Sequence, residues 1–111
     1  MNQTNSNLPE SVARYIEASN NFDAQAASAC FATDASVRDM EQDIVGIKAI
    51  ESWVAESSAK YQPQATVTRV QNEGENVAIT VDVAGQFPGS PVELEFDFHL
   101  RQGKIAQLTI R

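Results

Sequence analysis

The hydrophobic positions in the first third of the chain recur at the spacing of α-helices. Apolar side chains repeat every three or four positions after Leu8, which predicts a first helix that ends at Asn20. Asp23 is a suitable N-cap for a second, alanine-rich helix. We expect this second helix to carry Phe31 on its buried side and to end at residues 33–34.

A short strand and a third helix follow. Residues 35–39 alternate small or apolar side chains with polar ones, which is typical of a strand. After a polar loop, Gly46 precedes a stretch in which apolar residues again recur at helical spacing, from Ile47 to Tyr61. Because a proline disfavours helical backbone at the residue before it, we expect the third helix to end before Pro63.

In the rest of the chain the apolar spacing changes to that of β-strands. We expect strands at residues 64–70, 77–83 and 104–110, joined by short turns. Two prolines and two glycines in residues 85–91 exclude an uninterrupted ladder, so this segment is expected to be a turn or a bulged connection. The clearest strand pattern lies at residues 92–101. Its apolar face would hold Val92, Leu94, Phe96, Phe98 and Leu100, and its polar face Glu93, Glu95, Asp97, His99 and Arg101.

The order of these elements predicts the α+β class. Three helices, with one short strand among them, precede a run of strands joined by turns, which favours an antiparallel sheet with the helices on one face. The length of 111 residues suits a single domain, which we place at residues 8–111. The polar segment 1–7 is expected to be a disordered tail, and it lacks the apolar stretch of a secretory signal.

Charge and cysteine content argue against several classes of function. Fifteen acidic and eight basic residues give a net charge of −7, whereas nucleic acids and anionic membranes attract basic surfaces. No apolar run approaches the ~20 residues that span a bilayer. The only cysteine, Cys30, cannot form an internal disulfide and favours a reducing compartment. We therefore expect a cytoplasmic protein with neither nucleic acid nor a membrane as its partner.

Three stretches of the sequence carry a family resemblance. They are ARYIEASNNFDAQAASACFATDASVRDMEQDIVGIKAIESWVAE, VAGQFPGSPVELEF and LRQGKIAQLTI. In this order they resemble the SnoaL-like branch of the nuclear transport factor 2-like superfamily, and the second is similar to an uncharacterised bacterial subgroup. The resemblance covers roughly residues 8–111 and implies a cystatin-like cone, in which a curved antiparallel sheet wraps around three N-terminal helices and leaves an apolar pocket. It also implies a homodimer.

The resemblance further implies a candidate catalytic pair. Ketosteroid isomerases of this superfamily use a carboxylate base, with a Tyr and a protonated Asp as oxyanion donors. Asp39, in ASVRDM, matches the base and shares a predicted strand face with Val37, and Tyr15, in ARYIEA, matches the donor Tyr. Phe98 stands where the second donor belongs, and the neighbouring Asp97 points to the opposite face of its strand. A complete isomerase site is therefore not expected.

The two matching groups suit acid–base chemistry. An apolar surrounding disfavours the charged form of a carboxylate, which makes it a usable proton acceptor near neutral pH. The alternative is structural. Asp39 would then end a strand and bind a loop amide or Tyr15, and Tyr15 would be a core residue whose hydroxyl is paired. Both alternatives stay open at this point.

Aromatic and apolar residues supply a candidate ligand pocket around this pair. Trp53 lies on the third predicted helix and Phe87 in the Gly- and Pro-rich turn, and such side chains suit a flat organic ligand. Phe96, Phe98 and Val37 are expected on the inner face of the sheet. Each of these five residues can equally be plain core.

No metal or cofactor is expected. Residues Asp39, Glu41 and Asp43 have the spacing of the start of a calcium loop, but Ile44 and Ile50 occupy the positions that need Gly and Glu. One His and one Cys give no paired ligand spacing for zinc. Phosphate-binding loops and dinucleotide motifs are absent from the sequence.

The polar face of the strand at residues 92–101 has two interpretations. It faces solvent, or it meets its counterpart across a two-fold axis in a homodimer, where the acidic residues need cationic partners. Arg69, Arg101 and Lys104 are the candidates for that pairing, and His99 would lie in solvent or in the interface.

Two functions are therefore kept. The first is a pocket protein that binds a small, mostly apolar organic molecule, and that as an isomerase, cyclase or hydratase would use Asp39 as its general base. The second is a non-catalytic dimeric binding or scaffold module, in which the pocket is residual.

Overall fold

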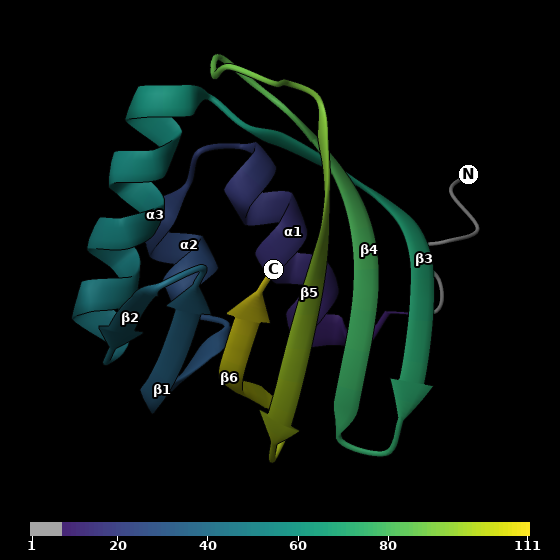
Figure 1. Ribbon diagram of the computed structural model, residues 1–111. Coiled ribbons are helices and arrows are strands. Elements are labelled where there is room, and N and C mark those ends of the chain that lie inside the picture. Colours follow the sequence, from purple (N-terminus) through teal and green to yellow (C-terminus); the bar gives the residue numbers. More distant parts are fainter. Residues whose placement is uncertain (1–7) are drawn as a thin grey trace.

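A computed structural model describes residues 8–111 of the chain (Figure 1). The tail that we predict to be disordered, residues 1–7, lies outside the described residues. The helices are α1 (Glu10–Asn20), α2 (Ala24–Ser28) and α3 (Ile47–Tyr61). The strands are β1 (Phe31–Asp39), β2 (Gln42–Val45), β3 (Gln64–Glu73), β4 (Asn76–Ala84), β5 (Val92–Arg101) and β6 (Lys104–Ile110). Among these residues, no helix is long and apolar enough to cross a membrane.

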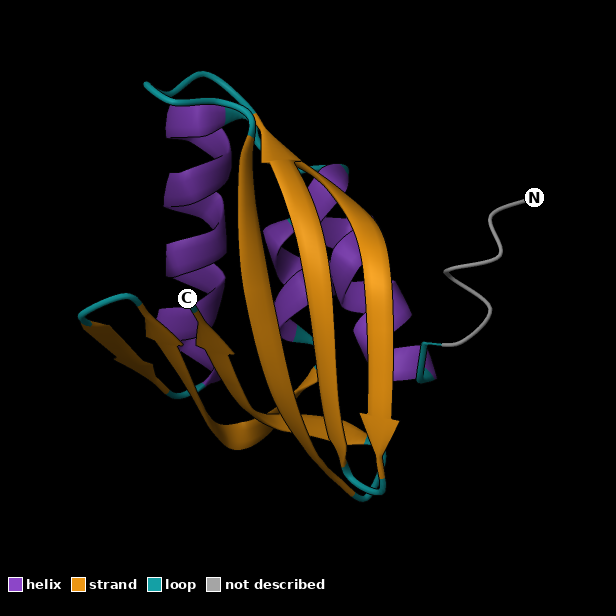
Figure 2. Ribbon diagram, turned by 45° about the vertical axis from the view of Figure 1, so that its right-hand side comes forward, coloured by secondary structure: helices purple, strands orange, loops and turns teal. Residues whose placement is uncertain are grey.

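The strands form one curved sheet in the order β2-β1-β6-β5-β4-β3. All neighbouring strands run antiparallel except β1 and β6, which are parallel. The three helices lie on one face of this sheet, as the turned view shows (Figure 2). The predicted α+β cone with an antiparallel-dominated sheet is therefore confirmed.

The third helix begins and ends where the local sequence predicts. Gly46 precedes α3 with φ +92°, a backbone conformation that suits glycine. The helix closes at Gln62, which has φ +48°, and Pro63 follows. The buried side of α3 carries Ile50 and Val54, four residues apart, and packs on the sheet.

The boundary between α2 and β1 corrects the sequence prediction. Asp23 does cap α2, because its Oδ1 accepts a hydrogen bond from the backbone N–H of Ala26 at 3.1 Å. The helix ends at Ser28, however, and Phe31 begins β1 instead of lying on the helix. Phe31 pairs with Ile105 of β6 and is buried. This pairing with a strand far along the chain outweighs the helix propensity of the alanines.

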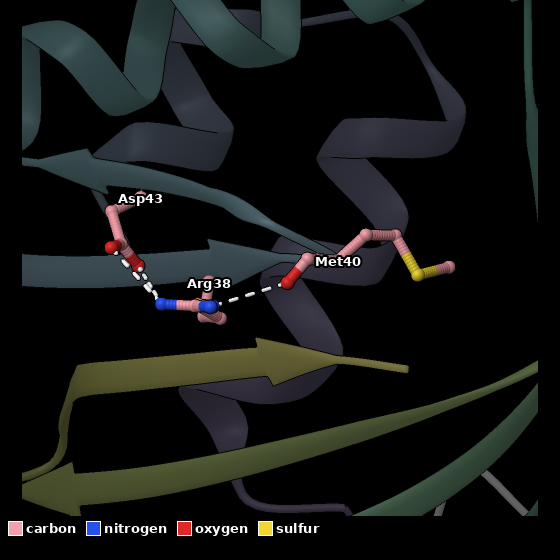
Figure 3. A network of polar contacts seen from close by, with 3 residues as sticks. All are labelled: Arg38, Met40 and Asp43. Carbon is pink, nitrogen blue, oxygen red and sulfur yellow. Dashed lines mark hydrogen bonds and ion pairs between the residues drawn. The ribbon is translucent and has the colours of Figure 1, made fainter.

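Strand β2 lies where the sequence predicts a polar loop. Of its four residues, only Ile44 is buried. Figure 3 shows what closes the β1–β2 hairpin: one nitrogen of Arg38, Nη1, donates to both carboxylate oxygens of Asp43 at 3.1 Å, and Nε donates to the carbonyl of Met40 at 3.1 Å. Polar cross-strand contacts rather than apolar alternation hold this hairpin, so hydrophobic periodicity could not predict it.

The core lies between the helices and the inner, helix-covered face of the sheet. The alternation predicted for β5 is confirmed, since Phe96 and Phe98 are buried while Glu95 and His99 are exposed. The same parity holds in β1, where Val37 is buried and faces the core. A one-residue shift of either strand would turn these side chains to the outer face. Strand parity therefore decides which polar groups can reach the interior.

Candidate ligand-binding site

A cavity of about 130 Å³ lies between α1, α3 and the inner face of the sheet. Its wall is mostly apolar and includes one carboxylate, that of Asp39. The wall consists of Tyr15, Ile16, Ser19, Asn20, Asp39, Trp53, Val54, Ser57, Ser58, Pro63, Ala65, Val83, Leu94, Phe96 and Ile110. The cavity therefore brings together Asp39, Tyr15, Trp53 and Phe96, four of the residues that the sequence analysis singled out.

Asp39 is the last residue of β1 and is half-buried. Its side chain is on the same face as Val37, and its carboxylate Oδ2 accepts a hydrogen bond from the indole Nε1–H of Trp53 at 3.1 Å. The adjacent Arg38 points to the other face, where Asp43 engages it. Within residues 8–111, no basic side chain forms an ion pair with Asp39. The loop amide and Tyr15, which were the structural alternatives, are not its hydrogen-bond partners.

The Tyr15 side chain is 3% exposed, and its hydroxyl forms no hydrogen bond with another residue of the range 8–111. It is not a fully enclosed polar group without a partner, since among the described residues only Ser11 Oγ is. Its ring packs edge-on against Phe31 and Phe98, with centroid distances of 5.4 and 6.0 Å. Burial, and after it the negative charge of Asp39, raises the pKa of the Tyr15 phenol above its ordinary value. The hydroxyl therefore stays protonated at neutral pH and is available as a donor to a group in the cavity.

Three residues predicted for the pocket lie elsewhere in the core. Val37 and Phe98 are both buried and do not appear in the wall of the 130 Å³ cavity. Phe87 packs edge-on against Tyr61 near the C-terminal end of α3, with a centroid distance of 5.9 Å. Phe98 instead supports the ring of Tyr15 from behind. The ligand-contact role of these three residues stays a prediction.

The sequence analysis identified Asn20 only as the end of a helix, but this residue fixes one rim of the cavity. Its amide Nδ2–H₂ donates to the carbonyl of Ala65 at 2.9 Å, and its Oδ1 accepts from the N–H of the same residue at 2.8 Å. Gln64 also donates to the Asn20 carbonyl at 2.7 Å. These bonds tie the end of α1 to the edge strand β3. A helix-ending Asn gives no local signal of such a role.

Asp97, the neighbour of the position where an isomerase has its second donor, does not belong to the wall of the cavity. On the outer face of the sheet, Asp97 binds the guanidinium of Arg111. His99 lies beside it, exposed, with Nδ1 at 2.9 Å from Oδ1 of Asn76. In the described residues, no group of three or more His, Cys, Asp or Glu side chains is arranged to hold a metal ion.

Comparisons with known proteins agree with this fold. The model of the SnoaL-like domain matches residues 12–108. A protein from Sinorhizobium meliloti, provisionally assigned as a polyketide cyclase, has 33% sequence identity and a TM-score of 0.92, with 96% of this chain and 98% of that chain covered. No curated protein matches the chain at a significant level.

Two more distant structures share the fold. A protein from Catenulispora acidiphila with a ketosteroid isomerase-like fold, solved in complex with trimethylamine, has 22% identity and a TM-score of 0.83, with 93% of this chain and 85% of that one covered. A cystatin-fold protein from Novosphingobium aromaticivorans has 17% identity and a TM-score of 0.80, with 99% of both chains covered. Because the matched family region spans nearly the whole described chain and contains Tyr15, Asp39 and Trp53, this protein belongs to the SnoaL-like domain family.

Proposed function

We propose that the cavity binds a small, mostly apolar organic molecule and that Asp39 acts on it as a general base, in an isomerase, cyclase or hydratase reaction. One observation carries the proposal. The carboxylate of Asp39, which has no cationic partner within residues 8–111, lines the same cavity as Tyr15, whose hydroxyl has no hydrogen bond to another described residue. Polar groups inside a protein are normally paired, so a hydroxyl that borders a cavity and lacks a protein partner is a candidate ligand contact.

The two groups have complementary proposed roles, one as proton acceptor and one as hydrogen-bond donor. Asp39 would take a proton from a carbon next to a carbonyl, and the Tyr15 hydroxyl would donate to the carbonyl oxygen as negative charge develops there. Phe98 stands in place of the second donor. Losing one oxyanion donor typically lowers kcat by roughly 10²–10³-fold. The proposed enzyme is therefore slower than an isomerase with both donors.

The volume limits the size of the ligand. A cavity of about 130 Å³ is close to the ~150 Å³ that holds benzene in an engineered protein core, and below the ~300 Å³ at which drug-sized pockets begin. We therefore propose a ligand of about one ring or a few carbons, and exclude a four-ring steroid from the cavity at this size. The same small volume favours the second function, a non-catalytic module with a residual pocket.

Ligand binding can be followed without a label. Trp53 is the only tryptophan, lines the cavity and is bonded to Asp39, so its fluorescence reports on occupancy. Small ketones, phenols and amines form the first panel of probes, the amines because the Catenulispora relative holds trimethylamine. Saturable change in Trp53 emission, followed by turnover that Asp39→Asn abolishes, supports the catalytic function.

The control for this experiment is Asp82→Asn, because Asp82 is an exposed carboxylate on β4 and lies outside the cavity. It should retain both binding and turnover. Binding without turnover by any probe favours the non-catalytic module. No saturable binding by any member of the panel contradicts a ligand site here.

We also propose that two copies pair through the outer face of the sheet. Arg101 binds Asp34 at 2.5 Å, and Lys104 Nζ donates to the carbonyl of Ala29 at 2.9 Å, so two of the three cations predicted for the interface are engaged within the chain. Arg111, at the end of the chain, instead offsets the charge of Asp97. This ion pair reduces the like-charge repulsion that pairing of two acidic faces would create.

Sedimentation of an Ala78→Glu variant tests the dimer. Ala78 is half-buried on the outer face of the sheet, where it pairs with Asp97 and lines the same groove. If the wild type is a dimer, a new carboxylate at this position should shift the equilibrium towards monomer. Ala55→Glu, at an exposed position of α3, is the matched control and should leave the dimer intact. A monomeric wild-type protein contradicts the proposal.

The proposed cytoplasmic location rests on the state of the cysteine. Cys30 is free and buried, and burial raises the pKa of its thiol, which lowers the fraction of reactive thiolate. Such a thiol is compatible with a reducing compartment. The net charge of −7 supports the proposal that neither nucleic acid nor an anionic membrane is the partner.

A further inference from the structure

The charges around the cavity are strongly asymmetric. Of residues 8–111, Asp39 supplies the only carboxylate of the wall, and no Lys, Arg or His of this range belongs to it. The nearby cations are engaged elsewhere. Arg38 binds Asp43 on the other face of the hairpin, Arg14 binds Glu10 at 2.7 Å on the surface of α1, and Arg111 binds Asp97 on the outer face of the sheet.

The carboxylate has one described hydrogen-bond partner, and that partner is neutral. The indole N–H of Trp53 donates to Oδ2 of Asp39 at 3.1 Å and leaves the negative charge of the carboxylate uncompensated. In a half-buried position, electrostatic interactions are screened less than at an exposed surface. A ligand that enters the cavity therefore meets a net negative potential, which an anionic ligand would oppose and a cationic one would satisfy.

Three of the other residues in the wall are aromatic. Tyr15, Trp53 and Phe96 all border the cavity, and each ring carries a negative quadrupole on its face. Aromatic rings together with a carboxylate form the type of site that binds methylated ammonium groups, whose apolar surface tolerates desolvation. An inorganic cation fits poorly, because Ca²⁺ and Mg²⁺ require about six oxygen ligands.

We infer that the ligand of this cavity is a small organic cation, of the methylated or alkylated ammonium class, and that Asp39 is its counter-ion. The inference rests on the proposed function, since it takes the cavity to be the ligand site. It deepens that proposal by excluding carboxylates and phosphates as ligands and by ranking cations above neutral molecules of the same shape. The negative net charge of the protein adds a weak attraction that ordinary salt screens.

Three probes of nearly equal shape test the inference. Choline is the cation, 3,3-dimethylbutan-1-ol is its neutral isostere, and 3,3-dimethylbutanoate is an anion of similar size. Calorimetry gives the dissociation constants, and Trp53 fluorescence shows whether the probe occupies the cavity. The wild-type protein should bind choline about tenfold or more tighter than the neutral alcohol, with the anion weakest.

The Asp39→Asn variant separates charge from shape. It keeps the size of the side chain and removes its negative charge, so the preference for choline over the neutral alcohol should fall to the small part that the aromatic rings supply. Asp82→Asn also removes one negative charge, but at an exposed position, and should keep the preference for choline.

The outcomes distinguish the inference from the proposed function. If the neutral alcohol binds in the cavity as tightly as choline, or if Asp39→Asn keeps the preference, the cation inference is wrong and the ligand site stands. If none of the three probes binds saturably and changes the emission of Trp53, both are wrong. A preference for choline that Asp39→Asn largely removes and Asp82→Asn keeps supports the inference.

Discussion

The two faces of the sheet treat their carboxylates in opposite ways. On the inner face, Asp39 borders a cavity, and within residues 8–111 its carboxylate receives one hydrogen bond, from the neutral indole of Trp53. On the outer face, Asp97 is paired with the guanidinium of Arg111. Both residues lie on strands, and a shift of one position would exchange their environments. The comparison shows that the outer-face carboxylate, Asp97, has a cationic partner, whereas the carboxylate that borders the cavity, Asp39, has only a neutral one among the described residues.

The largest effect that would sharpen this comparison is expected from shortening one buried side chain of β5. Phe98→Ala removes a buried ring that packs on Tyr15 and should lower the free energy of unfolding by about 3–5 kcal/mol. His99→Ala, one position along on the exposed face, should change it by no more than about 0.5 kcal/mol. Urea unfolding of the two variants measures the contrast. Equal losses would mean that the faces are assigned wrongly.

The next effect concerns the bond between Trp53 and Asp39. A hydrogen bond to an ionised group contributes about 1.5–3 kcal/mol, so Trp53→Phe should destabilise the wild-type protein by at least this contribution. The loss should be smaller in an Asp39→Asn background. A double-mutant cycle on urea unfolding, followed by circular dichroism because the tryptophan is lost, gives the coupling free energy. A coupling free energy of zero would show that the contact does not form in solution.

The raised pKa of Tyr15 predicts a dependence of stability on alkaline pH. The folded state holds the phenol proton more tightly than the unfolded state, whose tyrosine pKa is about 10. The effect of Tyr15 on stability is therefore independent of pH below about pH 10. Above it, the free energy of unfolding should fall by about 1.4 kcal/mol per pH unit from this group. Urea unfolding of the wild type and of Tyr15→Phe, from about pH 8 to about pH 11, gives the free energy of unfolding of each. The difference between the two free energies should show this slope above about pH 10.

The smallest effect has the opposite sign to most core substitutions. Because the Tyr15 side chain is buried and its hydroxyl has no hydrogen bond to another described residue, Tyr15→Phe should raise the free energy of unfolding near neutral pH, by at most about 1 kcal/mol. Tyr61→Phe, on a half-buried tyrosine outside the cavity, is the matched control and should change it little. A clear loss of stability in Tyr15→Phe would show that the hydroxyl has a structural partner.

Much of the fold follows from local sequence, and the exceptions share one cause. Gly46 and Pro63 delimit α3, and the two-residue alternation of β5 places Phe96 and Phe98 correctly, because each signal lies within one element. The predicted boundary between α2 and β1 was wrong, and strand β2 was not predicted. Phe31 is held in β1 by pairing with Ile105 of β6, at the other end of the chain, and no local pattern reveals this pairing.

The candidate site divides in the same way. Family resemblance and strand parity identified Asp39 and Tyr15, and the structure brings them to one cavity together with Trp53. The bond between Trp53 and Asp39 was not predicted, because nothing in their separation along the chain fixes how α3 crosses β1. Parity assigns a residue to a face but does not say which side chains border a void, so it could not separate Phe96, in the wall, from Phe98, behind it.

A proton–nitrogen NMR titration with choline tests most directly whether the inner-face carboxylate belongs to a ligand site. The indole N–H of Trp53, which is bonded to Asp39, gives a single resolved reporter, since the chain has one tryptophan. We predict that this resonance and the amides around Asp39 and Tyr15 shift together and saturate, while those of His99 and Arg111 stay in place. Shifts confined to the outer face, with the indole resonance unmoved, would contradict the assignment of the site.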